Sequence, residues 1–359
     1  MLYKLIYLFQ TDYSWLNVFR YITFRTILAT LSALILLLLI GTWVIGRLRT
    51  MQVGQHIRED GPPNHKGKAG TPTMGGCLIL PVVLFSVLLW ADLRNVYVWL
   101  VVFVILCFGL IGFVDDYLKV RDRSSKGLSI RRKFSLQAAV ALIVGVILYL
   151  YPGYDLHLNV PFFKTVTPHL GWLYIPLSIF IIVGASNAVN LTDGLDGLAV
   201  GPIIVAFTSY LFFAYLAGHV KIASYLQIPY VAGTGELSVL CGAVVGAGLG
   251  FLWYNAFPAE LFMGDVGSLP LGAVLGTVAV ITKQEIVLIL VGGLFVVETL
   301  SVIFQVAYFR MTGGRRILRM APLHHHFELK GWHESKVTVR FWIIAIVLAL
   351  LSISTLKLR

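Results

Sequence analysis

Charged residues are scarce in this 359-residue chain: Asp, Glu, Lys and Arg make up 13% of it, whereas apolar residues make up 58%. A soluble domain typically has about a quarter of its residues charged, so the composition excludes an ordinary soluble globule and predicts an integral membrane protein. The three cysteines, Cys77, Cys107 and Cys241, each lie inside an apolar stretch, which argues against disulfides and thiolate metal sites. The first twenty residues lack a small-residue cleavage site, so we expect no signal peptide.

Ten apolar stretches have lengths that suit helices crossing a bilayer. The sequence therefore predicts an all-α integral membrane protein, a single polytopic domain over residues 1–359 with ten transmembrane helices. The predicted spans are 22–45, 73–90, 96–114, 134–151, 172–189, 199–217, 238–256, 268–282, 286–308 and 338–356.

The loops divide Lys and Arg unequally. Loops after the odd-numbered spans contain 18 of these residues, whereas the other loops and the two ends contain eight. Since basic residues accumulate on the cytoplasmic side of membrane proteins, we expect the first set of loops in the cytoplasm and both termini in the periplasm. This asymmetry accounts for the net charge of +11, so we expect no nucleic-acid partner.

The densest group of polar residues is Asn190–Leu198, between two apolar stretches. If this segment is helical, Asp193 and Asp196 face the same way. Gly194 and Gly197 permit a ligand to approach the backbone closely. The alternative is a solvated turn with a helix cap.

Two further acidic groups lie at span ends. Asp115 and Asp116 end the third span, where the helix dipole disfavours negative charge, so either nearby bases such as Lys119 or a cation must balance them; a solvated helix end is the alternative. Asp265 precedes the eighth span in a glycine-rich corner typical of phosphate or metal sites at helix N-termini. Ser268 is expected to be an N-cap.

The last cytoplasmic loop contains three consecutive histidines, His324–His326. Adjacent side chains diverge on a regular backbone, which argues against zinc and favours a cation or a hydrogen-bond donor to phosphate. Residues 315–320 of the same loop predict a short amphipathic helix at the membrane surface. The Lys- and Gly-rich segment 66–76 suits either an anion cradle or a basic loop at the lipid headgroups.

The aspartates share one membrane face and offer only oxygen ligands, which favours Mg²⁺, or Mn²⁺ in its place. Lysines and histidines around them favour a polyphosphate. A carboxylate–metal–phosphate site at headgroup level is what phosphoryl transfer onto a lipid phosphate needs.

These motifs, across the whole chain, resemble those of the polyprenyl-phosphate N-acetylhexosamine-1-phosphate transferases. The resemblance implies a Mg²⁺-dependent enzyme of the bacterial cytoplasmic (inner) membrane, in which a UDP-linked donor gives its phosphosugar to undecaprenyl phosphate. The histidine motif and Lys68–Gly76 favour members that use UDP-N-acetylmuramoyl-pentapeptide, giving lipid I and UMP, over sister enzymes that use UDP-N-acetylglucosamine. The motifs are Asp115-Asp116 with Lys119, Asn190–Leu198, Phe262–Ser268 and Pro322–Glu328.

The resemblance also implies catalytic roles. Asp115 would take the proton from the lipid phosphate, and Asp116 would assist it or help to hold the metal. Asp265 would bind Mg²⁺, and His324 would steady the diphosphate. A covalent Asp nucleophile is an alternative that the sequence leaves open.

Substrate-binding roles follow in the same way. Phe262 would stack on uracil, whose edge would meet Gly194, Leu195 and Asp196. Residues expected around the ribose, phosphates and sugar are Lys68, Thr73, Asn190, Asp193, Asn255 and Gln305, with His325 and His326 nearby.

The ninth span carries Gly292-Gly293 and the lone acid Glu298, and we expect it to bend and to form an apolar groove for the lipid tail. A transporter is the alternative from another functional class, but its ionisable residues should lie near the midplane. The resemblance leaves open whether the enzyme is a monomer or a homodimer.

Overall fold

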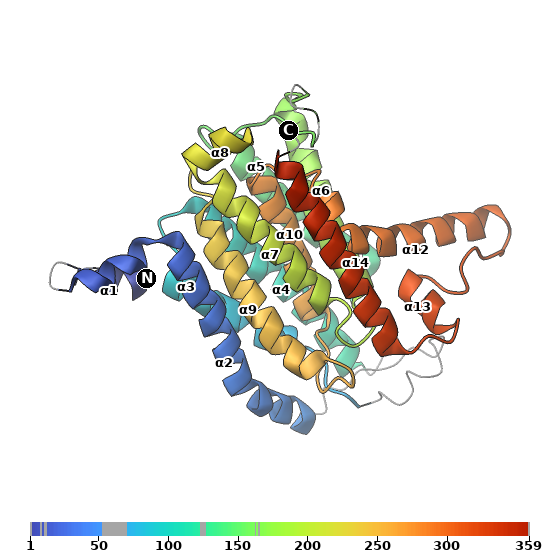
Figure 1. The fold of residues 1–359 in the computed structure, drawn as a ribbon. Helices are drawn as coiled ribbons and strands as arrows, with labels where there is room; N and C mark the ends of the chain where they lie inside the picture. The colour runs from blue at the N-terminus through green and yellow to red at the C-terminus, as the bar shows by residue number, and fades with distance from the viewer. Residues whose placement is uncertain are drawn as a thin grey trace.

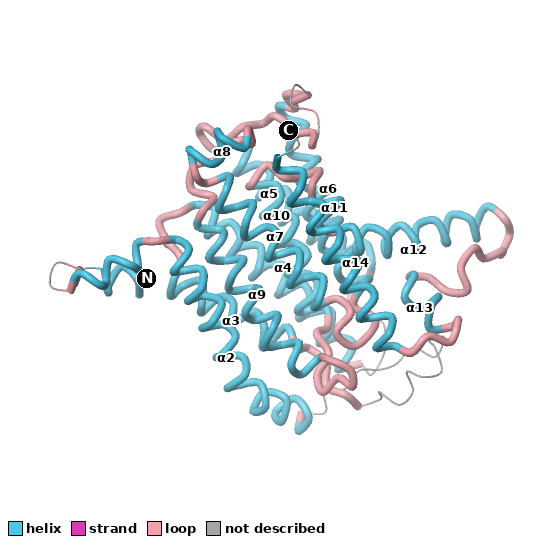
Figure 2. Tube along the Cα trace, viewed as in Figure 1, coloured by secondary structure: helices cyan, strands magenta, loops and turns pink. Residues whose placement is uncertain are grey.

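The computed structural model describes residues 2–7, 9–10, 13–51, 70–122, 127–161, 163 and 166–357. The described chain is helical and forms no β-strand, as predicted (Figure 2). His157 and His169 form an isolated antiparallel bridge in the loop before α6. The helices are α1 (Leu2–Tyr7), α2 (Ile22–Thr50), α3 (Gly76–Trp90), α4 (Val96–Arg121), α5 (Ile130–Leu150), α6 (Tyr174–Thr192), α7 (Val200–Ala217), α8 (Val220–Leu226), α9 (Glu236–Asn255), α10 (Asp265–Ile281), α11 (Leu288–Val291), α12 (Gly293–Met311), α13 (Leu323–Glu328) and α14 (Glu334–Ser354), with 3-10 turns at Ser14–Arg20, Gly171–Leu173 and Thr355–Lys357.

Each predicted span coincides with a helix, the ninth with the pair α11 and α12. In the described chain, eight helices are long and apolar enough to cross a membrane. The apolar helices α3 and α10 are shorter, at 15 and 17 residues. The chain is therefore a multi-pass membrane protein. Cys77, Cys107 and Cys241 are free, as predicted.

Helix α10 lies at the centre of the bundle, and every residue from Val266 to Ile281 is buried. It packs chiefly against α6 and α4. Small residues allow this close approach: a Cβ on Gly272 would lie 2.5 Å from the carbonyl oxygen of Ala185, and one on Gly276 would lie 3.0 Å from that of Ile181. Its position is therefore fixed by protein on all sides.

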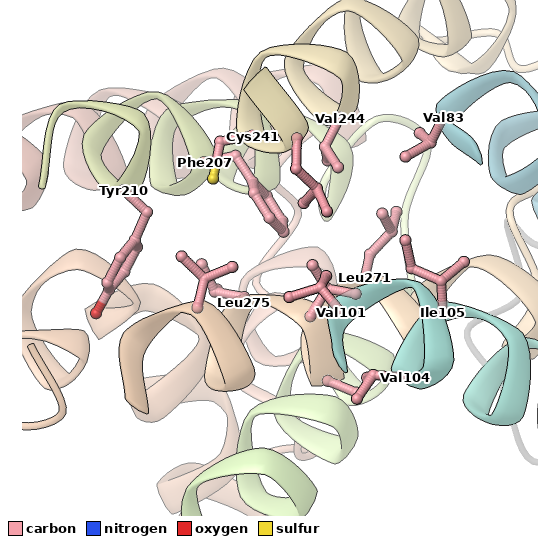
Figure 3. Packing of buried hydrophobic residues seen from close by; sticks show 14 of the residues in the cluster. Val83, Val101, Val104, Ile105, Phe207, Tyr210, Cys241, Val244, Leu271 and Leu275 are labelled. Atoms are coloured by element: carbon pink, nitrogen blue, oxygen red, sulfur yellow. The ribbon is translucent and has the colours of Figure 1, made fainter. Parts of the chain in front are cut away.

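The core continues as interdigitated apolar side chains between α10 and its neighbours. Figure 3 shows Leu271 and Leu275 of α10 facing Val101 of α4 and Phe207 of α7. Close packing of this kind leaves helix ends little freedom to shift. The polar groups at the end where α10 begins are consequently held in place.

The ninth predicted span is broken, as expected. Helix α11 ends at Val291, and α12 begins at Gly293 after Gly292, whose φ of −91° and ψ of 16° interrupt the helix. Beyond the break α12 runs sideways, away from the bundle (Figure 1).

The prediction of an amphipathic helix at residues 315–320 is wrong. Residues 315–316 have no regular secondary structure, and residues 317–320 form bends. The backbone groups of this segment are bound by a side chain of α12 instead of by one another. Gln305 Oε1 accepts hydrogen bonds from the amides of Ile317 (3.1 Å) and Leu318 (3.0 Å), and its Nε2 donates to the carbonyl of Leu318 (3.1 Å). Gln305 thus ties the loop to α12.

Candidate active site

Three carboxylates meet where α4 ends and α10 begins. Asp115, Asp116 and Asp265 each place an oxygen within 4.8 Å of the others. Lys119 Nζ lies 2.6 Å from Asp115 Oδ2, 3.3 Å from Asp116 Oδ1 and 3.1 Å from Asp265 Oδ2. Lys133, from α5, lies 2.5 Å from Asp265 Oδ2 and 3.7 Å from Asp115 Oδ2. The three carboxylates therefore converge on one point where they already hold a positive charge.

The two adjacent aspartates of α4 have different backbone partners. Asp115 Oδ1 accepts a hydrogen bond from the amide of Leu128 (2.8 Å), and Asp116 Oδ2 accepts one from the amide of Val266 (3.1 Å), at the start of α10. Gly264 makes this second contact possible, since its φ is +70° and a Cβ there would lie 2.5 Å from Asp116 Oδ2. The glycine-rich corner thus brings α10 onto the end of α4.

Asn190 connects α6 to the same cluster. Its Nδ2 donates to Asp265 Oδ1 (2.9 Å) and to Ser268 Oγ (2.8 Å). Ser268 is not the N-cap that the sequence predicts. Gly264, with its positive φ, starts the helix earlier, so Ser268 lies inside α10 and donates to the carbonyl of Gly264 (3.0 Å).

The Asn190–Leu198 segment is a helix end followed by a tight turn. Helix α6 ends at Thr192, so Asp193 and Asp196 do not share a helix face. Asp196 is buried; its Oδ2 accepts from the amide of Ala259 (2.9 Å), and its own amide donates to Glu334 Oε1 of α14 (2.7 Å). The turn is therefore held through Asp196 by the loop at Ala259 and by Glu334 of α14.

Asn255 binds the next residue of this turn. Its Oδ1 accepts from the amide of Gly197 (3.0 Å), and its Nδ2 donates to the carbonyl of Leu261 (2.8 Å). Trp342 Nε1 donates to the carbonyl of Gly197 (3.0 Å). The side-chain amide of Asn255 thus joins two loops that the family resemblance implies are at the nucleoside.

Asp193 is half-buried at the end of α6. Burial, together with the negative charges of Asp265, Asp116 and Asp196, raises its pKa to about 8. It is a carboxyl group that can hold a proton near neutral pH.

The three histidines have three different partners. His324 is buried, and its Nδ1 lies 3.1 Å from Glu298 Oε2. His325 Nδ1 lies 2.7 Å from Glu328 Oε2. His326 Nδ1 accepts from the amide of Arg319 (3.0 Å), and burial together with the charges of Lys330 and Arg319 lowers the pKa of its imidazole.

The other predicted site residues frame the cluster. Thr73 is buried, with its Oγ1 beside Gly264. Phe262 is half-buried, and its backbone pairs with the carbonyl of Pro72 and the amide of Gly75. Leu195 packs under the turn, against α12 and α14. Lys68 lies outside the described residues.

Sequence reasoning missed three residues with site contacts. Lys133 is one of seven bases in its loop, so nothing in the sequence singles it out. Glu334 reads as an ordinary first-turn acid of α14. Glu298 did carry a signal, as the lone acid within a predicted span, but the sequence does not show that it contacts His324.

The fold and the cluster define a class: a multi-pass membrane protein with a lysine-bridged acidic site at one end of its bundle. The model for glycosyl transferase family 4 matches residues 98–283, which include all three aspartates of the cluster. A second model, signature 1 of the phospho-N-acetylmuramoyl-pentapeptide-transferases, matches residues 68–80.

Full-length relatives narrow the class. Three relatives are phospho-N-acetylmuramoyl-pentapeptide-transferases, from Syntrophus aciditrophicus (strain SB), Citrifermentans bemidjiense and Desulforapulum autotrophicum. They are 63%, 59% and 58% identical to this chain over 359 residues, and each match covers 100% of both chains. The chain belongs to the phospho-N-acetylmuramoyl-pentapeptide-transferase family and is a transferase, as the motifs predict. The transporter and the sister transferase are set aside.

Proposed function

We propose that this chain transfers phospho-N-acetylmuramoyl-pentapeptide from its UDP-linked form to undecaprenyl phosphate, giving lipid I and UMP. An oxygen of the lipid phosphate attacks the β-phosphorus of the donor, the bond to the bridging oxygen breaks, and UMP leaves with that oxygen. The observation that carries the proposal is the convergence of Asp115, Asp116 and Asp265 on one point beside Lys119 and Lys133, in a chain that belongs to this family.

Each charged residue of the cluster has a part in this reaction. Asp115 accepts the proton of the lipid phosphate, with Lys119 beside both aspartates of α4. Lys133 and Asn190 orient Asp265 through its two oxygens. The lysine ammonium groups attract the phosphates of both substrates and offset the charge that develops on the leaving UMP.

The carboxylates fit Mg²⁺, because three side chains from two helices already direct oxygens at one cation, the Lys119 ammonium. Asp265 would hold the ion, with Asp115 and Asp116 beside it. When bound, Mg²⁺ supplies positive charge to the phosphate oxygens. Mn²⁺ has the same preference for oxygen ligands.

For the donor, Phe262 stacks on uracil, and Gly194, Leu195 and Asp196 meet the edge of the base. Lys68, Thr73, Asn190, Asp193 and Gln305 line the ribose, phosphates and sugar, with His324, His325 and His326 on the diphosphate side. Asn255 supports this surface by joining the Gly197 turn to Leu261.

We also propose that the chain is one polytopic domain of ten transmembrane helices in the bacterial inner membrane, with both termini periplasmic and the carboxylate cluster cytoplasmic. The unequal distribution of Lys and Arg supports this orientation. The lipid tail would lie where α12 leaves the bundle, along exposed apolar residues such as Val297 and Phe304.

The test is lipid-extractable label from radiolabelled UDP-N-acetylmuramoyl-pentapeptide, with undecaprenyl phosphate and Mg²⁺, beside labelled UDP-N-acetylglucosamine. We expect label from the muramoyl donor alone, lost with EDTA and in Asp265→Ala. The matched control is Asp122→Ala, because Asp122 is an exposed aspartate at the end of α4 paired with Arg121. Transfer from neither donor would contradict the proposal.

A further inference from the structure

Glu298 is a buried acid that the proposed reaction does not use. It lies in the second turn of α12 with 0% of its surface exposed. Burying a carboxylate costs several kcal/mol unless hydrogen bonds and a counter-charge offset it, and an acid inside a membrane helix generally marks a function. Its partners should therefore indicate what it does.

Both carboxylate oxygens of Glu298 face one residue of another element. Oε1 accepts the backbone amide of His324 at 3.2 Å, and Oε2 lies 3.1 Å from Nδ1 of the same histidine. Since a carboxylate oxygen only accepts, Nδ1 carries the proton of this bond. Glu298 thus fixes the position of His324 and also the direction in which its ring points.

The second ring nitrogen points at the turn after α6. A Cβ placed on Gly194 would overlap Nε2 of His324. Nε2 is buried and has no hydrogen-bond partner among the described residues, a costly state for a polar atom that a ligand can relieve. Glu298 on α12, His325 on α13 (ring centroids 4.2 Å apart) and Asp193 beside Gly194 are the titratable groups around it.

We propose that Glu298 is a positioning residue: it holds His324 as an imidazolium whose Nε2–H donates to a phosphate oxygen of the donor. Phosphate oxygens are acceptors, so Nε2 must carry a proton to bind one. With Nδ1 protonated as well, the ring is cationic, and in this buried place the carboxylate of Glu298 is its counter-charge. The inference rests on the proposed function. It adds that Glu298 of α12 acts on the phosphates of the donor through His324.

The experiment is a double-mutant cycle on Glu298→Gln and His324→Ala, following kcat, both KM values and the dissociation constant of the donor. Glu298→Gln keeps a hydrogen-bonding side chain but removes the charge. We expect it to lower kcat about 10- to 100-fold, the range of a hydrogen bond to a charged group, with little change in the KM for undecaprenyl phosphate. In the His324→Ala background it should have almost no further effect, because it acts only through His324.

Glu298→Asp separates charge from shape. Aspartate keeps the charge and should recover part of kcat, whereas a residue needed only for packing would tolerate the isosteric glutamine better. The cycle on donor binding gives a result even where His324→Ala does not turn over. The inference would be overturned if the effects of Glu298→Gln and His324→Ala on donor binding and kcat multiplied in the double variant. It would also be overturned if Glu298→Gln were at least as active as Glu298→Asp.

The matched control is Glu285→Gln, another buried glutamate, at the opposite end of the bundle beside Lys283 and Tyr174. It should lower the Tm, and its effect on donor binding should be the same with and without His324. The thermal unfolding of every variant is recorded so that kcat refers to folded enzyme. An inactive wild-type protein would contradict the proposed function itself, whereas an active one with independent effects would remove only the role of Glu298.

Discussion

At the scale of single residues, two glycines with positive φ allow the cost of backbone strain to be distinguished from the cost of a lost close contact. Gly264 and Gly313 have φ of +70° and +66°. A Cβ on Gly264 would lie 2.5 Å from Asp116 Oδ2, whereas one on Gly313 would have nothing within 4 Å. Alanine at either position should cost on the order of 1–3 kcal/mol of backbone strain.

Only Gly264→Ala should also displace Asp116, and we expect it to lower kcat at least about tenfold while Gly313→Ala stays close to wild type. The checks are label transfer and thermal unfolding of both variants. Equal kcat values would show that the approach of Gly264 to Asp116 is unimportant for turnover.

Asp193 predicts a pH dependence of stability. Its pKa of about 8 exceeds the value of about 3.9 in an unfolded chain, so the folded state binds the proton more tightly. The stability that this group contributes is complete below about pH 4 and is lost as the pH rises through about 8.

Asp193→Asn cannot titrate, so the Tm of the metal-free variant should fall less between these pH values than the Tm of the wild type. Asp122→Asn is the control, because pairing with Arg121 lowers the pKa of Asp122 and it stays ionised in that window. Parallel Tm profiles for wild type and Asp193→Asn would contradict the expectation.

At the scale of elements, the loop that follows α10 contains a buried ion pair that contacts Tyr174 of α6. Lys283 is fully buried; its Nζ lies 3.1 Å from Glu285 Oε1 and donates to Tyr174 Oη at 3.0 Å. Lys283→Met would leave Glu285 as a buried charge without its counter-ion, which costs about 3–5 kcal/mol.

We therefore expect a clear fall in Tm for Lys283→Met and partial recovery when Glu285→Gln is added. Lys221→Met removes an exposed lysine of α8 and should leave the Tm nearly unchanged. The measurement is thermal unfolding in one detergent. A Lys283→Met variant as stable as Lys221→Met would show that the ion pair does not stabilise the fold.

The elements also show where sequence reasoning succeeds. Uninterrupted apolar stretches place the helices, and Gly292 marks the break before α12, because both follow from local backbone preferences and burial. Ser268 and residues 315–320 were misread because Gly264 and Gln305, which decide their conformation, act through backbone geometry and a contact from α12.

Side-chain partners are harder to predict for the same reason. Asp115, Asp116 and Asp265 were identified as a group because their chemistry is dense in the sequence. That Lys133 contacts Asp265, and Glu298 contacts His324, depends on how α5 and α12 pack against the rest, which no local pattern determines.

At the scale of the whole molecule, the distribution of Lys and Arg predicts which loops face the cytoplasm. In a variant whose three cysteines are replaced, Tyr225→Cys on α8 should react with a membrane-impermeant maleimide in intact cells. Arg316→Cys, in the loop after α12, should react only after permeabilisation. Both side chains are exposed, so access and not burial decides the result. The reverse pattern would invert the proposed orientation.

The complete enclosure of α10 has a consequence for how the protein is made. A helix with no lipid-facing side gains little from the bilayer until its neighbours are in place. Helices α3, α4, α6 and α7, against which α10 packs, all precede it in the chain, and synthesis proceeds from the N-terminus. The four helices that surround α10 are therefore synthesised before it, so α10 can pack against them as soon as it leaves the ribosome.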